Sequence, residues 1–419
     1  MQFNILSKTT LNIFCSRVFK TLLLAVALQT PAFSQQFNTI FNFNGTNGAN
    51  PDTGLVIDKA GNLYGINEAI GTFNLGSVFK LSPPVLGHTT WTRTTLVNFN
   101  GKNGQNPSAG LVIDPSGNLY GSTAQGGLFN FGTVFKLSPP NLGHATWTRT
   151  TLINFNGING AFPSGIVADA SGNLYGSVGD KSGASLSRTI FKLTPPSDGH
   201  TAWLGTNLIT FEISTGGNPF KSLVVDPIGN IYGTSYLGGT SDLGLVFKLT
   251  PPASGQSTWT RSTLVNFNGA NGAHPYSGLI LDSSGNIYGT TPVGGVFNLG
   301  TVFKLTPPTP GHSAWTRTTL VNFNSTNGSF PEANLTFDST GNLYGATVGG
   351  GLFNLGTIFR LSPPTIEHTA WIRTTLINFN GANGINPTTG VIFDSNENLF
   401  GTTQNGGAFG LGTVFKITK

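Results

Sequence analysis

Short apolar stretches, each bounded by turn-forming residues, follow one another along almost the whole chain. In the segment 109–160, residues 110–114, 118–122, 133–137 and 146–155 are rich in β-branched and aromatic side chains. They are separated by Asp-Pro-Ser-Gly-Asn, by a glycine-rich connection and by Ser-Pro-Pro, and consecutive prolines cannot continue a hydrogen-bonded ladder. The pattern therefore predicts four short antiparallel strands joined by turns.

This four-strand unit repeats with a fixed period of 56 residues. Its Phe-Lys-Leu motif, in full or degenerate form, centres on Phe79, Phe135, Phe191, Phe247, Phe303, Phe359 and Phe415. Seven such units predict an all-β fold, a seven-bladed β-propeller of four-stranded antiparallel blades. A linear solenoid is the alternative, but it would need polar caps at both ends, and neither end carries one.

The two ends of the repeat region complement each other. Residues 37–45 align with the fourth strand of a unit, whereas the last unit, 390–419, stops after its third strand. We therefore expect the N-terminal strand to complete the C-terminal blade and to close the ring. A closed ring removes the exposed sheet edges that would otherwise promote aggregation. The propeller is expected to span residues 35–419.

The N-terminal segment 1–34 has the order of features found in a secretory signal peptide. Cations come first, the apolar run 21–28 follows, and the small residues Ala32 and Ser34 stand at cleavage spacing. The apolar run is too short to span a bilayer, and no second hydrophobic segment follows it. We expect a secreted, periplasmic or cell-surface protein with no membrane span.

The charge balance does not indicate a nucleic-acid partner. The formal net charge is +5, but three of the cations lie in the predicted signal peptide, and removing them leaves about +2. The remaining lysines and arginines fall at repeated strand positions and form no single basic patch. We expect a monomer that binds no nucleic acid.

The repeat also resembles a known family. The motif "GNLYG…GG…GTVFKL", in full or degenerate form in all seven units, looks like the GloVer tandem repeat of choice-of-anchor secreted bacterial proteins. The segment "GLVIDPSGNLYG" is similar, less specifically, to the inner strands of NHL-type propellers. The resemblance implies an exported bacterial protein and brings no established activity. Members often carry a C-terminal sorting signal, and none is expected after the strand that ends at Lys419.

Several polar residues that recur in every or nearly every unit could bind a metal ion or a ligand, but a role in turns or packing explains each of them better. One aspartate per unit precedes the first turn, where it can accept backbone hydrogen bonds, with calcium binding as the alternative. Most units carry one histidine at an equivalent position, and one histidine per blade does not bring three or four ligands around a single zinc ion. The glycine-rich connections lack the helix and lysine that a phosphate-binding loop requires. Trp147 and Arg149 lie two residues apart on one strand face, where they can stack.

No catalytic constellation or cofactor site stands out, so residues that break the repeat become the candidates. In each blade the connection between the second and third strands and the connection to the next blade lie on the same face, which we call the upper face. Unmatched charged residues that map to it include Asp52 and Glu332. The units that depart furthest supply the candidate ligand-binding residues Asp180, Lys181, Glu212, Asp242 and His274; evolutionary drift on tolerant loops is the alternative.

The blade-to-blade loops on this face read "NFNGTNGANP" and close variants, and their amides suit both turns and sugar hydroxyls. The favoured hypothesis is an exported, non-enzymatic propeller that binds an extracellular glycan or protein. A hydrolase or lyase seated at the third and fourth units is the first alternative. A structural envelope or matrix protein is the second.

Overall fold

The computed structural model describes residues 35–68, 71–107, 109–141, 146–182, 187–197, 201–212 and 223–418. By its internal contacts the chain divides into a unit Phe37–Thr418 and a unit made of Met1–Gln36 with Lys419. The predicted signal peptide, 1–34, lies outside the described residues. Among the described residues, no helix has the length and apolar character needed to cross a bilayer.

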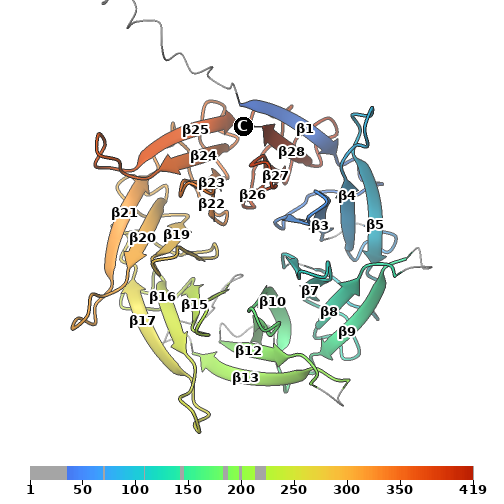
Figure 1. Ribbon diagram of the computed structural model, residues 1–419, viewed down its shortest axis with the longest axis horizontal. Helices are drawn as coiled ribbons and strands as arrows, with labels where there is room; N and C mark the ends of the chain where they lie inside the picture. Colours follow the sequence, from blue (N-terminus) through green and yellow to red (C-terminus); the bar gives the residue numbers. More distant parts are fainter. Residues whose placement is uncertain are drawn as a thin grey trace, which may run out of the picture. The chain divides into compact units, whose positions relative to one another are not determined.

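The Phe37–Thr418 unit consists of seven four-stranded antiparallel sheets arranged as the blades of a ring, as predicted (Figure 1). Blade 1 comprises β2 (Val56–Ile57), β3 (Leu63–Asn67), β4 (Ser77–Ser82) and β5 (Thr92–Asn98), and blade 2 comprises β6 (Val112–Ile113), β7 (Leu119–Thr123), β8 (Thr133–Ser138) and β9 (Thr148–Asn154). Blade 3 comprises β10 (Ala161–Ala168), β11 (Leu174–Gly179), β12 (Arg188–Thr194) and β13 (Leu204–Phe211), and blade 4 comprises β14 (Val224–Val225), β15 (Ile231–Ser235), β16 (Leu245–Thr250) and β17 (Thr260–Asn266). Blade 5 comprises β18 (Ile280–Leu281), β19 (Ile287–Thr291), β20 (Thr301–Thr306) and β21 (Thr316–Asn322), and blade 6 comprises β22 (Thr336–Phe337), β23 (Leu343–Thr347), β24 (Thr357–Ser362) and β25 (Ile372–Asn378).

Blade 7 is built from both ends of the chain. It contains β26 (Ile392–Phe393), β27 (Leu399–Thr403), β28 (Thr413–Thr418) and, as its outer strand, β1 (Gln36–Asn42). The Phe43 amide donates to the carbonyl of Gly412 at 3.1 Å, and the side chain of Asn42 accepts from the Ala408 amide at 2.9 Å. The predicted closure of the ring by the N-terminal strand is confirmed.

The innermost strand of most blades is shorter than predicted. In blade 2 only Val112 and Ile113 pair with β7, so residues 110 and 111 of the expected strand are outside the ladder. Blade 3 differs, because β10 is eight residues long and pairs with β11 through two register shifts. The chain just before each short inner strand is therefore not held by the sheet.

Neighbouring blades are joined by pairs of buried phenylalanines. Phe211, at the end of the outer strand of blade 3, lies 4.6 Å from Phe247 of blade 4 between ring centroids, and both side chains are fully buried. The Phe247 ring crosses directly over Gly233 on the adjacent strand. A Cβ atom added to that glycine would lie 2.5 Å from the ring. The repeated Tyr-Gly step thus leaves the room that the phenylalanine needs.

The tryptophans and arginines also pack, but not against each other as the sequence suggested. The Arg149 guanidinium lies 5.5 Å from the centre of the Phe135 ring, a cation–π arrangement. Trp147 instead makes an edge contact with Tyr64 of the preceding blade, with ring centroids 5.7 Å apart. The expected tryptophan–arginine stack is wrong, because the guanidinium points inward between two blades while the indole spans their outer edge.

The repeated aspartates cap the first turn of each blade. In blade 6 the Asp338 carboxylate accepts from the backbone and side chain of Asn342 and from the Tyr344 hydroxyl. Burial raises the pKa of Asp338, but the hydrogen bonds that its carboxylate accepts from the side chains and backbone amides of Asn342 and Thr340 outweigh burial and lower the pKa to about 2. Burial and the neighbouring carboxylate raise the pKa of Tyr344 to about 12. The predicted turn-capping role is confirmed.

Candidate functional site

The asparagine-rich loops of the upper face use much of their polar capacity internally. The Asn100 amide donates to Oδ1 of Asn103 at 2.8 Å, and the Asn103 amide donates back to Oδ1 of Asn100 at 3.0 Å. Nδ2 of Asn103 then donates to the Asn98 carbonyl. The same reciprocal pair recurs between Asn268 and Asn271 and in other blades. These asparagines therefore shape the loops, which accounts for their repetition without a ligand.

The candidate residues of blade 3 lie together at one end of that blade. Asp180 and Lys181 are exposed directly after β11, and Oδ1 of Asp180 caps the Ser182 amide at 2.8 Å. Lys181 packs over Gly157, since a Cβ atom on that glycine would lie 2.9 Å from the lysine Cβ. Glu212 is exposed after β13 and accepts from the Ser187 hydroxyl. Their role in binding remains a prediction.

The other two candidates, Asp242 and His274, meet at the boundary of blades 4 and 5. Oδ1 of Asp242 accepts from the Gly238 amide at 2.7 Å, and the His274 amide donates to the carbonyl of the next residue, Leu243. The His274 ring stacks on Tyr236 with centroids 4.7 Å apart, and Nδ1 lies 3.0 Å from the Tyr236 carbonyl oxygen. Asp242 thus acts as a loop cap, and His274 belongs to an aromatic cluster.

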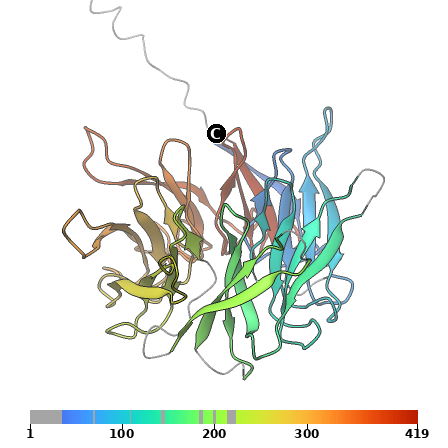
Figure 2. The same ribbon diagram turned by 60° about the horizontal axis from the view of Figure 1, so that its bottom comes forward.

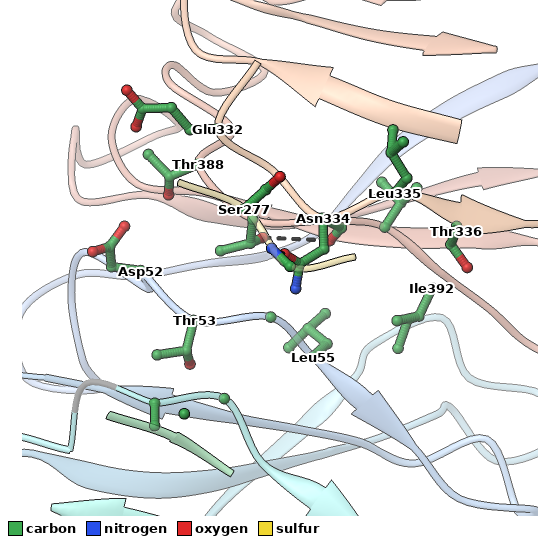
Figure 3. A pocket seen from close by; sticks show the side chains of 18 of the residues that line it. Asp52, Thr53, Leu55, Ser277, Glu332, Asn334, Leu335, Thr336, Thr388 and Ile392 are labelled. Carbon is green, nitrogen blue, oxygen red and sulfur yellow. Dashed lines mark hydrogen bonds between the residues drawn. The ribbon is translucent and has the colours of Figure 1, made fainter. Parts of the chain in front are cut away.

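A cavity of about 720 Å³ lies on the axis of the ring, and none of these five candidate residues lines it. Its walls come from all seven blades, mainly from the inner strands and the residues just before them. The upper-face loops contribute Val348, Asn386 and Gln404, so the cavity lies at the upper end of the central channel. Figure 3 shows this cavity from close by.

One sequence position at the cavity breaks the repeat in nearly every blade. We call it the mouth position: the residue after the proline that precedes each inner strand. Asp52, Tyr276, Glu332 and Thr388 occupy it in blades 1, 5, 6 and 7, and all four line the cavity. The framework around them repeats closely, whereas the residues at this position differ in charge, size and polarity.

The wall formed by blades 5, 6, 7 and 1 is the most polar part of the cavity. Asp52 and Glu332 are half-buried on blades 1 and 6, and Thr388 comes from blade 7 between them (Figure 3). Asn334 stands where most blades have glycine, and its Oδ1 accepts from the Gly278 amide of blade 5 at 2.7 Å. Two carboxylates and an amide therefore lie on one wall of the cavity, together with the Thr388 side chain.

Among the residues that the structure describes, two threonine hydroxyls on this wall have no hydrogen-bond partner. Oγ1 of Thr388 and Oγ1 of Thr53 are both buried and unpaired. For Thr53 the cause is visible in the sequence: in blade 7 the equivalent Thr389 bonds to Thr402 across the sheet at 2.8 Å, but blade 1 has Ile66 in place of that threonine. A buried hydroxyl without a partner costs free energy, so rotation of either side chain toward a polar ligand in the cavity that it lines would be favoured.

Tyr276, Asn334 and Thr388 were missed by reasoning from the sequence, although Asp52 and Glu332 were noted as unmatched charges. The sequence did contain a signal for these residues: the residue at the mouth position varies from blade to blade, whereas the repeat residues around it are almost invariant. Only the uncharged members went unnoticed, because charge was the criterion.

Within the described ranges, no three histidine, cysteine, aspartate or glutamate side chains gather as metal ligands would. His88, His312 and His368 are exposed on separate hairpins between the third and fourth strands. The candidate site is therefore defined by hydrogen-bonding groups and one aromatic ring at the end of a channel.

The fold and this axial site define a propeller repeat protein, and the family can be stated. The family model of the Gloeobacter/Verrucomicrobia repeat matches residues 28–224 and 189–373. The chain belongs to this family, as its resemblance to the GloVer repeat implied. A comparison with curated proteins found no match.

Solved structures share the fold at low sequence identity. The chain is similar to the extracellular domain of the proposed one-component system BT4673 from B. thetaiotaomicron, with a TM-score of 0.57 and 13% identity over 91% of this chain. It is also similar to the extracellular domain of the proposed hybrid two-component system BT3049 from the same organism, with a TM-score of 0.51 and 13% identity over 92% of this chain. The chain spans only 40% and 41% of those two chains. At this identity the likeness concerns the fold alone.

Proposed function

We propose that this protein is an exported, non-enzymatic binding module that recognises an extracellular glycan at the upper end of its central channel. One observation carries the proposal: the mouth position differs from blade to blade while the surrounding repeat is kept. Seven like residues would present a symmetric ring, whereas unlike residues converging on one space can recognise an asymmetric ligand.

The groups on the polar wall suit sugar hydroxyls. Asp52 and Glu332 accept hydrogen bonds, Asn334 both donates and accepts, and the unpaired hydroxyls of Thr53 and Thr388 can do either. The Tyr276 ring offers a flat face, and it lies 6.4 Å from Tyr236 in an edge contact that fixes its orientation. A sugar that pairs the two orphaned hydroxyls would remove their desolvation cost.

Two further observations favour an extracellular role. The segment 1–34 reads as a signal peptide, and the two structural neighbours described above are extracellular domains. Those neighbours are much longer chains, so only the placement of the domain outside the cell is carried over to this protein.

The proposal is tested by measuring retention of the mature protein on a panel of immobilised polysaccharides and cell-envelope fractions. Glu332→Gln and Thr388→Val should each weaken retention about tenfold, because the first replaces a charged acceptor oxygen by an amide donor and the second removes a hydroxyl from a desolvated site. Glu367→Gln is the matched control: it is exposed on a hairpin of the opposite face and should bind like the wild type.

Three outcomes would contradict the proposal. Retention that is equal in Glu332→Gln, Thr388→Val and the wild type would place the binding surface elsewhere. An absence of retention on every material would remove the glycan as a ligand. Release of soluble sugar products, measured as reducing ends in the same samples, would show an enzyme in place of a binder.

A further inference from the structure

A second site becomes visible when the seven junctions between blades are compared. Each junction contains a pair of phenylalanines, one from the end of an outer strand and one from the third strand of the following blade. In blade 5 the Arg317 guanidinium lies against both rings of such a pair, 5.8 Å from the centre of the Phe267 ring and 5.6 Å from that of Phe303. We call the space that this side chain fills the interblade slot.

Six of the seven slots are filled by the protein itself. Five blades place a guanidinium over one or both rings of the pair, from Arg93, Arg149, Arg261, Arg317 and Arg373. In blade 7 the aligned residue is Phe37, whose ring stacks on Phe415 at 5.5 Å. The slot thus takes a flat side chain, most often a cationic one.

The slot between blades 2 and 3 is the exception. The strand register aligns Gly205 with the arginines, because Gly205 pairs with Leu193 as Arg149 pairs with Leu137. Phe155 and Phe191 are still present, with centroids 5.4 Å apart. A cavity of about 230 Å³ opens beside them, lined also by Ile153, Asn159, Leu193, Gly205, Thr206 and Asn207.

The cavity retains hydrogen-bonding groups at its edge. In blade 2, Nη1 of Arg149 donates to the Thr151 hydroxyl at 2.8 Å. In blade 3, Asn207 takes the place of that threonine, since it pairs with Phe191 as Thr151 pairs with Phe135. Gly205, Thr206 and Asn207 are all exposed, so the cavity opens to solvent at the outer strand.

We propose that this slot binds the arginine side chain of a partner peptide, with its guanidinium against the rings of Phe155 and Phe191 and a hydrogen bond to Asn207. The chain itself supplies the precedent, since five guanidinium groups occupy the equivalent space. A buried guanidinium beside aromatic rings gains cation–π energy, and its planar shape fits a narrow slot better than a lysine ammonium does. The site is separate from the axial cavity and independent of its proposed ligand.

Charge is retained in such a slot at neutral pH. Burial lowers the pKa of Arg149, Arg317 and Arg373 to about 10 in each case, which still leaves the guanidinium protonated. An arginine entering the blade 3 slot would therefore bind as a cation. A ligand of the same shape without the charge should bind more weakly.

The test uses N-acetylarginine methylamide as the probe and the citrulline analogue as its uncharged counterpart. Binding to the mature protein is measured by calorimetric titration and by the rise in melting temperature. We expect one site per chain for the arginine probe and at least about tenfold weaker binding of the citrulline analogue. Gly205→Arg should fill the slot and abolish binding.

Blade 5 provides the matched control. Arg317→Gly opens an equivalent slot between Phe267 and Phe303, so this variant should bind two probes and recover part of its lost thermal stability when the probe is added. The double variant Gly205→Arg, Arg317→Gly should again bind one. Blade 4 already combines an arginine, Arg261, with an isoleucine, Ile209, at the position equivalent to Ile153, so Gly205→Arg has a precedent in the fold.

Asn207→Leu serves as a second variant that does not depend on filling the slot, and it should weaken binding by several-fold. The proposal is overturned if the citrulline analogue binds as tightly as the arginine probe. It is also overturned if Gly205→Arg, correctly folded, still binds the probe, or if no probe binds to the wild type at all.

Discussion

Replacement of Phe43 by alanine would test whether the N-terminal strand holds the ring closed in solution. Phe43 follows β1 and is fully buried. It packs with Leu55 and Phe79 of blade 1 and with Phe400 and Val414 of blade 7. Removing a buried phenyl ring from such a cluster costs about 3–5 kcal/mol, because apolar burial is lost and a cavity remains.

The expected change in melting temperature follows from the size of the propeller. A cooperative unit of this length has an unfolding entropy of roughly 0.8 kcal/mol/K, so a loss of about 4 kcal/mol lowers the melting temperature by roughly 5 °C. Tryptophan fluorescence reports the transition, and Trp91 lies at the closing junction, 5.9 Å from the Phe400 ring. The free energy of unfolding is measured in urea with the same signal.

Phe267→Ala is the matched control, because Phe267 occupies the same place at the junction of blades 4 and 5. If β1 is seated as described, the two variants should lose similar stability. A loss in Phe267→Ala with none in Phe43→Ala would refute closure by the N-terminal strand. Equal stability of both variants and the wild type would refute the packing argument itself.

Three further changes follow from individual contacts. Gly233→Ala should lower the free energy of unfolding by several kcal/mol in urea titration, because its Cβ would meet the Phe247 ring; an unchanged midpoint would mean that the ring can move aside. Phe247→Ala should cost about 3–5 kcal/mol by the same measurement, and retained stability would place this ring outside the junction. In the folded protein the pKa of Asp338 is about 2, below the value of about 3.9 in the unfolded chain. The ionised carboxylate therefore stabilises the fold at neutral pH, and this contribution is lost as the pH falls from about 4 to 2. Asp338→Asn should therefore flatten the dependence of stability on pH in that range, and a profile identical to that of the wild type would contradict the assignment.

The fold was predictable because the strands and turns carry strong local signals that recur in register. The aligned aspartates, glycines and prolines fixed the turns, and the spare strand at 37–45 matched the strand missing after residue 419. Partners within one blade are close in sequence, so their pairing is set by local turn geometry. Most inner strands are shorter than predicted because only two residues of each, such as Val112 and Ile113, make ladder pairs with the second strand.

The candidate sites were less predictable because they depend on which loops converge. Asp52 and Glu332 are 280 residues apart in sequence and share one wall only when the ring is closed. Asp242 was selected as an unmatched charge, yet it caps the Gly238 amide as Asn298 caps the equivalent Gly294 amide in blade 5. The slot in blade 3 exists because Gly205 has no side chain to fill it, and a search of the sequence for reactive residues does not select a glycine.

The pairing of β1 with β28 also fixes the order of events when the protein is made. The outer strand of blade 7, β1, precedes all the other strands of the propeller in the sequence and its partner, β28, follows them, so this sheet cannot form until β28 has been synthesised. Until then β1 has no partner strand, and the apolar face of blade 1 that covers Phe43 lies open. The ring therefore closes only after every strand of the propeller has been made, and β1 must remain free of other strand pairings until then.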